Sequence, residues 1–203
     1  MEEQLLKQLY EDDEIYQSIL KDNYKNRRFI INQDIDDDLL EYIVLSIIKI
    51  NQCDKHIPKE KRNKIYIYIN SNGGDVIMGS QILGIIKASI TPIITVGLAK
   101  CASMASYILL AGHERYCFDN TVVLCHDGQA GYVSSGNKGK DIQKFYDKLN
   151  DRMTNFMIEN TKMTGEFLEE IKDREYYMFG SEAKDLGIVD YIIGVDCSLD
   201  DIL

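Results

Sequence analysis

Residues 97–111 read GLAKCASMASYILLA, a run of small residues that ends in an apolar segment. The β-branched residues 93–96 precede it and predict a buried strand that stops at Gly97. The apolar residues after Ser103 have helical character, so Ser103 is expected at the N-terminus of a helix. Unpaired N–H groups and the helix dipole favour negative charge there. The position suits a nucleophile, although a serine can also be a simple helix cap.

The composition disfavours several classes of protein. The chain has 203 residues, of which 45% are hydrophobic and 28% charged, as in a single soluble domain with a buried core. Its net charge of −10 argues against a nucleic-acid partner, because phosphate binding needs a basic surface. No apolar run reaches the roughly 18 residues of a membrane helix, so no membrane contact is expected. The charged start Met1-Glu2-Glu3 is not a signal peptide, and we expect a cytoplasmic protein.

The cysteines do not indicate a disulfide framework or a metal site. They are five in number and lack CxxC spacing: Cys53, Cys101, Cys117, Cys125 and Cys197. We interpret them as reduced and mostly buried side chains. The sequence also lacks a P-loop, an HExxH motif and a dinucleotide fingerprint, so neither a metal nor a cofactor is expected.

Strand and helix patterns alternate along the chain. Strands are predicted at residues 28–32, 65–69, 93–96, 121–125 and 189–193, and helices at 16–20, 39–48, 75–89, after Ser103, and at 138–161, 165–173 and 181–186. Residues 65–69 alternate Ile and Tyr, which predicts a sheet covered by helices on both faces. The alternation predicts an α/β fold with a largely parallel sheet, formed by one domain over residues 1–203.

Three segments that follow the ends of predicted strands contain residues that can carry chemistry: 70–74 (NSNGG), 102–104 (ASM) and 125–127 (CHD). Functional groups of open α/β sheets lie beyond the carboxyl ends of the strands, so we expect these segments to meet. Ser103 needs a base, because a free hydroxyl is a weak nucleophile. His126 follows a strand directly, whereas His56 and His113 lie in turns where solvent exposure is the simple explanation. Paired glycines often only make a tight turn, but the order of the three segments favours catalysis.

With these residues the sequence resembles the proteolytic subunit family of Clp proteases, which are self-compartmentalising serine peptidases. The matching segments are 68–74 (YINSNGG), 97–99 (GLA), 102–105 (ASMA), 108–112 (ILLAG), His126, 181–183 (SEA) and 186–190 (LGIVD). The likeness runs from about residue 16 to 193. It implies a ClpP- and crotonase-like spiral of β-β-α units, with an N-terminal segment at 1–15 and a handle-like loop and long helix at about 132–164.

The resemblance also implies roles for individual residues. Ser103 would be the nucleophile and His126 the general base, and the N–H groups of Gly74 and Met104 would form an oxyanion hole. Substrate would lie extended beside Gly73, Gly74 and Gly128, and pair as an added strand.

The same resemblance implies an assembly and its partners. It predicts a homo-oligomer, as a heptameric ring or double ring, that encloses a chamber for peptides or unfolded proteins. An AAA+ unfoldase would be a separate partner. The apolar stripe of the helix at 138–161, which includes Phe145 and Phe156, would pair across two stacked rings, with plain core packing as the alternative.

The chain departs from the family pattern around the predicted site. Asn72 replaces a proline, Asp127-Gly128 replaces Gln-Pro, and the interval between Ser103 and His126 is slightly short. The position of the family's catalytic aspartate falls on Glu175.

Glutamate can orient a histidine in some α/β-hydrolases, although its extra methylene shifts the carboxylate. Asp173 is the alternative acid, and both can also be ordinary surface acids, which would leave a degraded triad.

Several functions therefore stay open at this point. The first is a serine endopeptidase that acts by Ser-His-acid acyl transfer in an oligomeric chamber. The second is a catalytically weak ClpP-like scaffold or regulatory subunit. The departures also suit a phage capsid-maturation protease, and a crotonase-type acyl-CoA enzyme shares the fold and its oxyanion hole.

Overall fold

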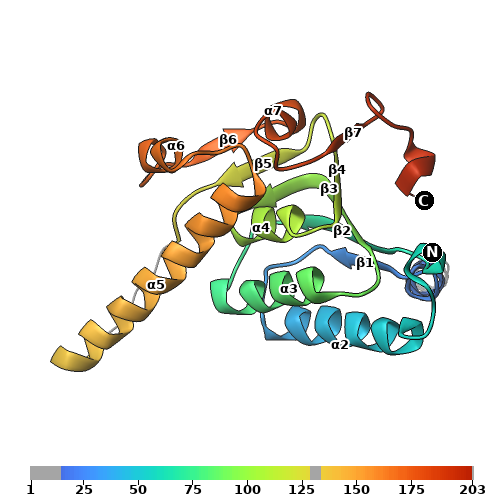
Figure 1. The fold of residues 1–203 in the computed structure, drawn as a ribbon, viewed down its shortest axis with the longest axis horizontal. Coiled ribbons are helices and arrows are strands. Elements are labelled where there is room, and N and C mark those ends of the chain that lie inside the picture. Colours follow the sequence, from blue (N-terminus) through green and yellow to red (C-terminus); the bar gives the residue numbers. More distant parts are fainter. Residues whose placement is uncertain (1–14, 129–133, 203) are drawn as a thin grey trace, which may run out of the picture.

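The computed structural model describes residues 15–128 and 134–202. Within them, a seven-stranded sheet has the order β1-β2-β3-β4-β7, with β5 beside β3 and β6 beside β5 (Figure 1). Its strands are β1 (Arg28–Ile31), β2 (Ile65–Ser71), β3 (Ile93–Ala102), β4 (Glu114–Phe118), β5 (Val122–Cys125), β6 (Tyr176–Met178) and β7 (Tyr191–Ile193). The helices are α2 (Asp37–Asp54), α3 (Val76–Ala88), α4 (Met104–Leu110), α5 (Gly136–Asn160), α6 (Gly165–Glu170) and α7 (Gly180–Asp185). Residues 15–25 are helical, and η1 (Lys59–Lys61) and η2 (Leu199–Ile202) are short 3-10 helices.

The predicted α/β fold class is confirmed. Five strand pairings of the described residues are parallel, and β5 with β6 is the antiparallel one. Side-chain caps begin several helices, as at Asp36 before α2 and Asp75 before α3. The predicted segment at 1–15 lies outside the described residues except for residue 15, as does part of the loop before α5.

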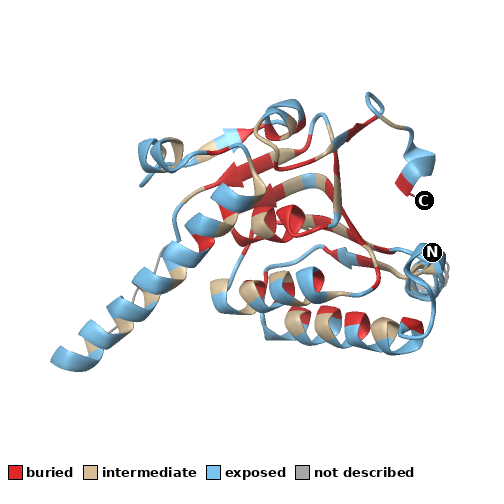
Figure 2. Cartoon of the chain, in the orientation of Figure 1, coloured by how far each residue is buried: buried red, intermediate tan, exposed pale blue. Residues whose placement is uncertain are grey.

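The two faces of the sheet are covered differently. On one face Ile65, Ile67 and Ile69 are fully buried in the main core, to which α2, α3 and α4 contribute (Figures 1 and 2). On the other face Tyr66 and Tyr68 pack in a smaller cluster with Ile94, Val96, Tyr116, Ile193 and Ile202. The expectation of helices on both faces of this strand is wrong, because C-terminal residues around η2 cover its second face.

The central strand β3 is longer than the sequence pattern predicts. The strand that begins at Ile93 does not stop at Gly97 but continues to Ala102. It can do so because it has two successive parallel neighbours: β4 pairs with Ile94–Gly97, and β5 pairs with Lys100–Ala102. One of these neighbours, β4, directly follows His113 and lies where the sequence pattern predicts no strand.

The long helix α5 projects from the rest of the molecule (Figure 1). Only Met153 and Met157 are buried among its 25 residues, and both lie in its C-terminal half. Figure 2 shows the opposite half as largely exposed. Phe145, on that half, is 50% exposed. Among the described residues, the apolar stripe of α5 is therefore covered at its C-terminal end only.

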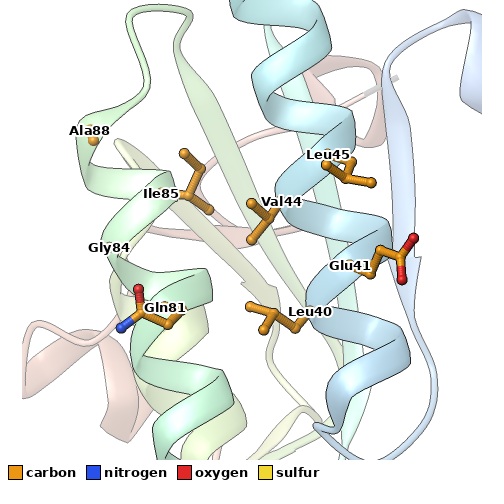
Figure 3. A pocket seen from close by; sticks show the side chains of 8 residues that line it. All are labelled: Leu40, Glu41, Val44, Leu45, Gln81, Gly84, Ile85 and Ala88. Atoms are coloured by element: carbon orange, nitrogen blue, oxygen red, sulfur yellow. The ribbon is translucent and has the colours of Figure 1, made fainter.

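A shallow apolar groove of about 440 Å³ lies between α2 and α3 (Figure 3). It is lined by Leu40, Glu41, Val44, Leu45, Gln81, Gly84, Ile85 and Ala88. None of these is a predicted site residue, so the groove is separate from the candidate active site. Among the residues described, no helix is both long and apolar enough to cross a membrane.

Candidate active site

Ser103 occupies a sharp turn between β3 and α4. Its backbone has φ 52° and ψ −128°, a conformation that costs a residue with a side chain about 1–3 kcal/mol. Although Ser103 is the N-cap residue of α4, its side chain makes no capping hydrogen bond. The interpretation of Ser103 as a simple cap therefore lacks the contact that defines a cap. Ser103 is partly buried at the carboxyl end of β3, in a strand-turn-helix geometry like that of the nucleophile elbow of α/β-hydrolases.

His126 lies at the carboxyl end of the neighbouring strand β5. β5 runs parallel to β3 with Ala102 opposite Leu124, and the Ser103 amide donates to the Leu124 carbonyl at 3.0 Å. His126 follows β5 directly, and its side chain is 20% exposed. The parallel pairing thus brings the predicted nucleophile and the predicted base to adjacent strand ends.

Glu175 lies opposite His126 because of the register of β6. This strand pairs antiparallel with β5, and Cys125 opposite Tyr176 is the last pair. The next pair along the ladder is His126 and Glu175, and Nδ1 of the histidine lies 2.9 Å from Oε1 of the carboxylate.

Asp173, the alternative acid, is held through its backbone N–H. Its backbone N–H donates to Oδ2 of Asp127 at 2.8 Å, and its φ is +58°. Of the two candidate acids, Glu175 is the one that contacts the imidazole of His126.

The serine and the histidine are not yet hydrogen-bonded to each other. Within the described parts of this isolated chain, no hydrogen bond joins Oγ of Ser103 to the ring of His126. Catalytic hydrogen bonds are often long or misaligned in a resting enzyme and tighten when substrate binds. The His126–Glu175 half of the site is therefore formed, while the Ser103–His126 half is not closed.

The two glycines after β2 bring the backbone against the serine turn. Gly73 has φ +101°, and a Cβ placed on it would lie 2.7 Å from Cβ of Ser103 and 2.8 Å from the Ala102 carbonyl. The same Cβ would lie 3.1 Å from the Met104 amide nitrogen, so the glycine turn touches the start of α4. Only glycine fits this contact.

Hydrogen bonds on the far side of the glycine turn hold it in place. The amide of Ile35 donates to the Gly73 carbonyl at 2.9 Å, and the amide of Asp75 donates to the Ile35 carbonyl at 2.8 Å. The Gly73 amide donates to Oγ of Ser71 at 3.1 Å. These bonds do not use the Gly74 amide. The Met104 amide, at the first position of α4, has no acceptor within its helix.

Asn72, which replaces the proline of the family pattern, has a side-chain partner. Nζ of Lys100 donates to Oδ1 of Asn72 at 2.9 Å, which ties the glycine turn to β3. Asn72 thus makes a side-chain contact with β3 that a proline at this position could not make.

The cysteines beside the site are not suited to act as nucleophiles. Cys125 precedes His126 and is buried, and burial raises the pKa of its thiol to about 12. Burial also raises the pKa of the Cys101 thiol strongly. All five cysteines are free, with Cys53 exposed and Cys197 partly exposed. Within the described residues, no group of three His, Cys, Asp or Glu side chains could hold a metal ion.

Two histidines lie away from the site. His56 is exposed, as expected. His113 is also exposed, and its Nδ1 accepts the Ile93 amide at 3.1 Å, which gives it a structural role that the sequence pattern did not predict.

Gly128 is exposed after the site, and the residues that follow it, 129–133, lie outside the described parts of the chain. Asp127 was noted in the sequence only as a departure from the family pattern. Its position directly after a strand-end histidine was the signal in the sequence that could have placed Asp127 at the site, where it accepts a hydrogen bond from the Asp173 amide.

A serine at a strand-to-helix turn, beside a His–Glu pair on neighbouring strands, is an arrangement typical of serine hydrolases. The chain matches the family model "Clp protease" over residues 11–196, and it belongs to that family. It is also similar to the ATP-dependent Clp protease proteolytic subunit 2 of Tropheryma whipplei (strain Twist). The two are 33% identical over 167 residues, which cover 80% of this chain and 88% of that protein.

Proposed function

We propose that this chain is a serine endopeptidase in which Ser103 is the nucleophile, His126 the general base and Glu175 the acid that orients it. The family supports a serine peptidase in general. The observation that carries the assignment of residues is the 2.9 Å contact between Nδ1 of His126 and Oε1 of Glu175, beside the strained turn of Ser103.

The proposed reaction is acyl transfer followed by hydrolysis. Oγ of Ser103 attacks the peptide carbonyl carbon, and Nε2 of His126 takes the hydroxyl proton. The Nδ1–H of the ring donates to Glu175, which stabilises the imidazolium. When the C–N bond breaks, His126 gives its proton to the leaving amine. Water then attacks the acyl carbon while His126 takes its proton. The bond between that carbon and Oγ breaks, and His126 returns the proton to Oγ of Ser103 as the free acid leaves.

The proposed oxyanion hole consists of the backbone N–H groups of Gly74 and Met104. Its support is the contact of the glycine turn with the start of α4, in which two backbone segments converge next to Ser103. Such donors stabilise the oxyanion of the tetrahedral intermediate, and removal of one costs about 10²–10³-fold in kcat in other hydrolases. An extended peptide would pair beside Gly73 and Gly74, with Gly128 at the other side of the site.

The proposed assembly is a homo-oligomeric ring or double ring around a chamber. Its support within this chain is the half of α5 that the rest of the fold leaves exposed, including Phe145. Phe156 suits such a contact less, because its ring packs 6.4 Å from that of Tyr107 and under Nζ of Lys87. The name of the Tropheryma relative describes an ATP-dependent protease, and a separate AAA+ unfoldase is the corresponding partner proposed here.

Active-site labelling tests the proposed function. A fluorophosphonate should modify the wild-type protein stoichiometrically at Ser103, and Ser103→Ala should abolish the modification. Ser46→Ala is the matched control, since Ser46 is a buried serine of α2, a helix that carries no proposed site residue. Intact folded protein without labelling or peptidase activity would instead support a catalytically weak scaffold.

A further inference from the structure

The turn that carries Glu175 has little regular structure to hold it. It connects α6, which ends at Glu170, with β6, a strand of only three residues. Within the turn, the Arg174 amide donates to the Ile171 carbonyl at 3.1 Å. Asp173 takes a left-handed conformation with φ +58°, which is uncommon for a residue with a side chain. Glu175 itself is 49% exposed, so packing does not restrict its side chain tightly.

One side chain ties this turn to the histidine strand. Oδ2 of Asp127 accepts the Asp173 amide at 2.8 Å. A carboxylate is a stronger acceptor for an N–H group than a neutral oxygen. Because β5 and β6 pair only as far as Cys125 and Tyr176, this bond lies on the far side of the His126–Glu175 contact. The contact is therefore bracketed by backbone pairing on one side and by Asp127 on the other.

We propose that Asp127 is a positioning residue that fixes the 171–174 turn and thereby keeps the Glu175 carboxylate against His126. The inference rests on the proposed function of the triad and deepens it. Asp127 contacts neither substrate nor the reacting atoms in this role. It acts on the conformation at Asp173, two residues before Glu175, where a small rotation of the backbone would swing the long glutamate side chain away from the ring.

Two substitutions of Asp127 separate this role from a general effect on folding. Asp127→Ala removes the acceptor of the Asp173 amide. We expect kcat for a fluorogenic peptide to fall about 10- to 100-fold, because misplacing a catalytic group by about 1 Å has a cost of that size. KM should stay within twofold of the wild-type value. Asp127→Asn keeps an oxygen at the same place and should recover most of the loss. Asp185→Ala, which removes an exposed acid from the end of α7, is the matched control.

A double-mutant cycle tests whether Asp127 acts through Glu175. If it does, Asp127→Ala should lower kcat in the wild type but have almost no further effect in a Glu175→Gln background. Equal losses in both backgrounds would overturn the proposal, as would an Asp127→Ala variant with unchanged kcat.

A crystal structure of Asp127→Ala gives a readout that does not depend on activity. We expect the distance between Nδ1 of His126 and Oε1 of Glu175 to exceed hydrogen-bonding range, with the 171–174 turn displaced. An unchanged contact would overturn the proposal. A wild-type protein that fails to label at Ser103 would overturn the proposed function, whereas the crystal structure would still decide the positioning role.

Discussion

His126 and Glu175 face each other one step beyond the last pair of the antiparallel β5–β6 ladder, with Nδ1 and Oε1 2.9 Å apart. The ladder sets the separation of the two backbones, so the length of the acidic side chain decides whether the carboxylate reaches the ring. Glutamate meets this requirement in the present chain.

This relationship predicts a dependence on side-chain length. Glu175→Gln should lower kcat about 10²–10⁴-fold, because the amide cannot stabilise the imidazolium by charge. The kcat of Glu175→Asp should lie between those of Glu175→Gln and the wild type, since the aspartate side chain is shorter by one methylene. Steady-state peptidase kinetics would measure both. Asp173→Asn keeps the backbone donor, so its kcat should fall far less than that of Glu175→Gln. A larger loss of kcat in Asp173→Asn would assign the role of the catalytic acid to Asp173 instead.

The glycine turn predicts a steric effect on activity. In Gly73→Ala the new Cβ would meet Cβ of Ser103 at 2.7 Å and the Ala102 carbonyl at 2.8 Å, at a φ of +101°. We expect the Ser103 turn to shift and fluorophosphonate labelling to slow at least tenfold, in line with loss of an oxyanion donor.

Gly84→Ala is the control for this substitution. Gly84 lies in α3 with no atom within 4 Å of its added Cβ, so the variant should label normally and gain about 0.5–1 kcal/mol of stability. Equal labelling rates for Gly73→Ala and Gly84→Ala would contradict the close approach of the turn to the serine.

A buried ion pair predicts acid sensitivity of the fold. Asp54 is fully buried and accepts hydrogen bonds from Arg27 at 2.6 and 2.9 Å and from Thr91 at 2.8 Å. The bonds from Arg27 hold the pKa of the Asp54 carboxyl below its ordinary value, against the opposing effect of burial, and Thr91 adds to them. Asp54→Asn should lower the free energy of unfolding by about 3 kcal/mol at pH 7.

The pH dependence of this difference follows from the direction of the shift. The stabilisation is complete above the ordinary aspartate pKa of 3.8 and is lost as the pH falls through the lower pKa of the folded state. Chemical unfolding of the wild type and Asp54→Asn should be measured between pH 3 and 7. The difference between their free energies of unfolding should shrink only at the acidic end of this range. Lys64→Ala, which breaks the exposed pair with Glu114, should cost under about 1 kcal/mol. If Lys64→Ala lowered the free energy of unfolding as much as Asp54→Asn, burial would not explain why the Arg27–Asp54 pair contributes more than an exposed pair.

The exposed half of α5 predicts a change in particle size. Phe145→Glu should disrupt a contact between copies of this helix, because it places a charge in an apolar interface while changing no buried residue of the chain. Sedimentation velocity should then show smaller particles than the wild type. Lys148→Glu, at an exposed position of the same helix, should sediment as the wild type does. An unchanged profile for Phe145→Glu would contradict the proposed contact between copies of α5.

Local patterns were sufficient to predict most of the elements. Side-chain periodicity and the β-branched runs located β1, β2 and β5 and the helices α2, α3 and α5, because each is long or apolar enough to show its period. β6 escaped notice because three residues carry no readable alternation. The extension of β3 past Gly97 escaped as well, because it depends on the neighbours β4 and β5 rather than on its own residues.

Residue order within one element and its flanks was enough to place Ser103 between a buried strand and a helix, and His126 directly after another strand. The folded sheet was needed to show which of the two acids contacts His126 and from which amide the Asp127 carboxylate accepts a hydrogen bond. Glu175 reaches the ring through an antiparallel pairing between segments 49 positions apart. Such a pairing depends on how distant strands align in the folded sheet, and nothing in the local order of residues near Glu175 specifies that alignment.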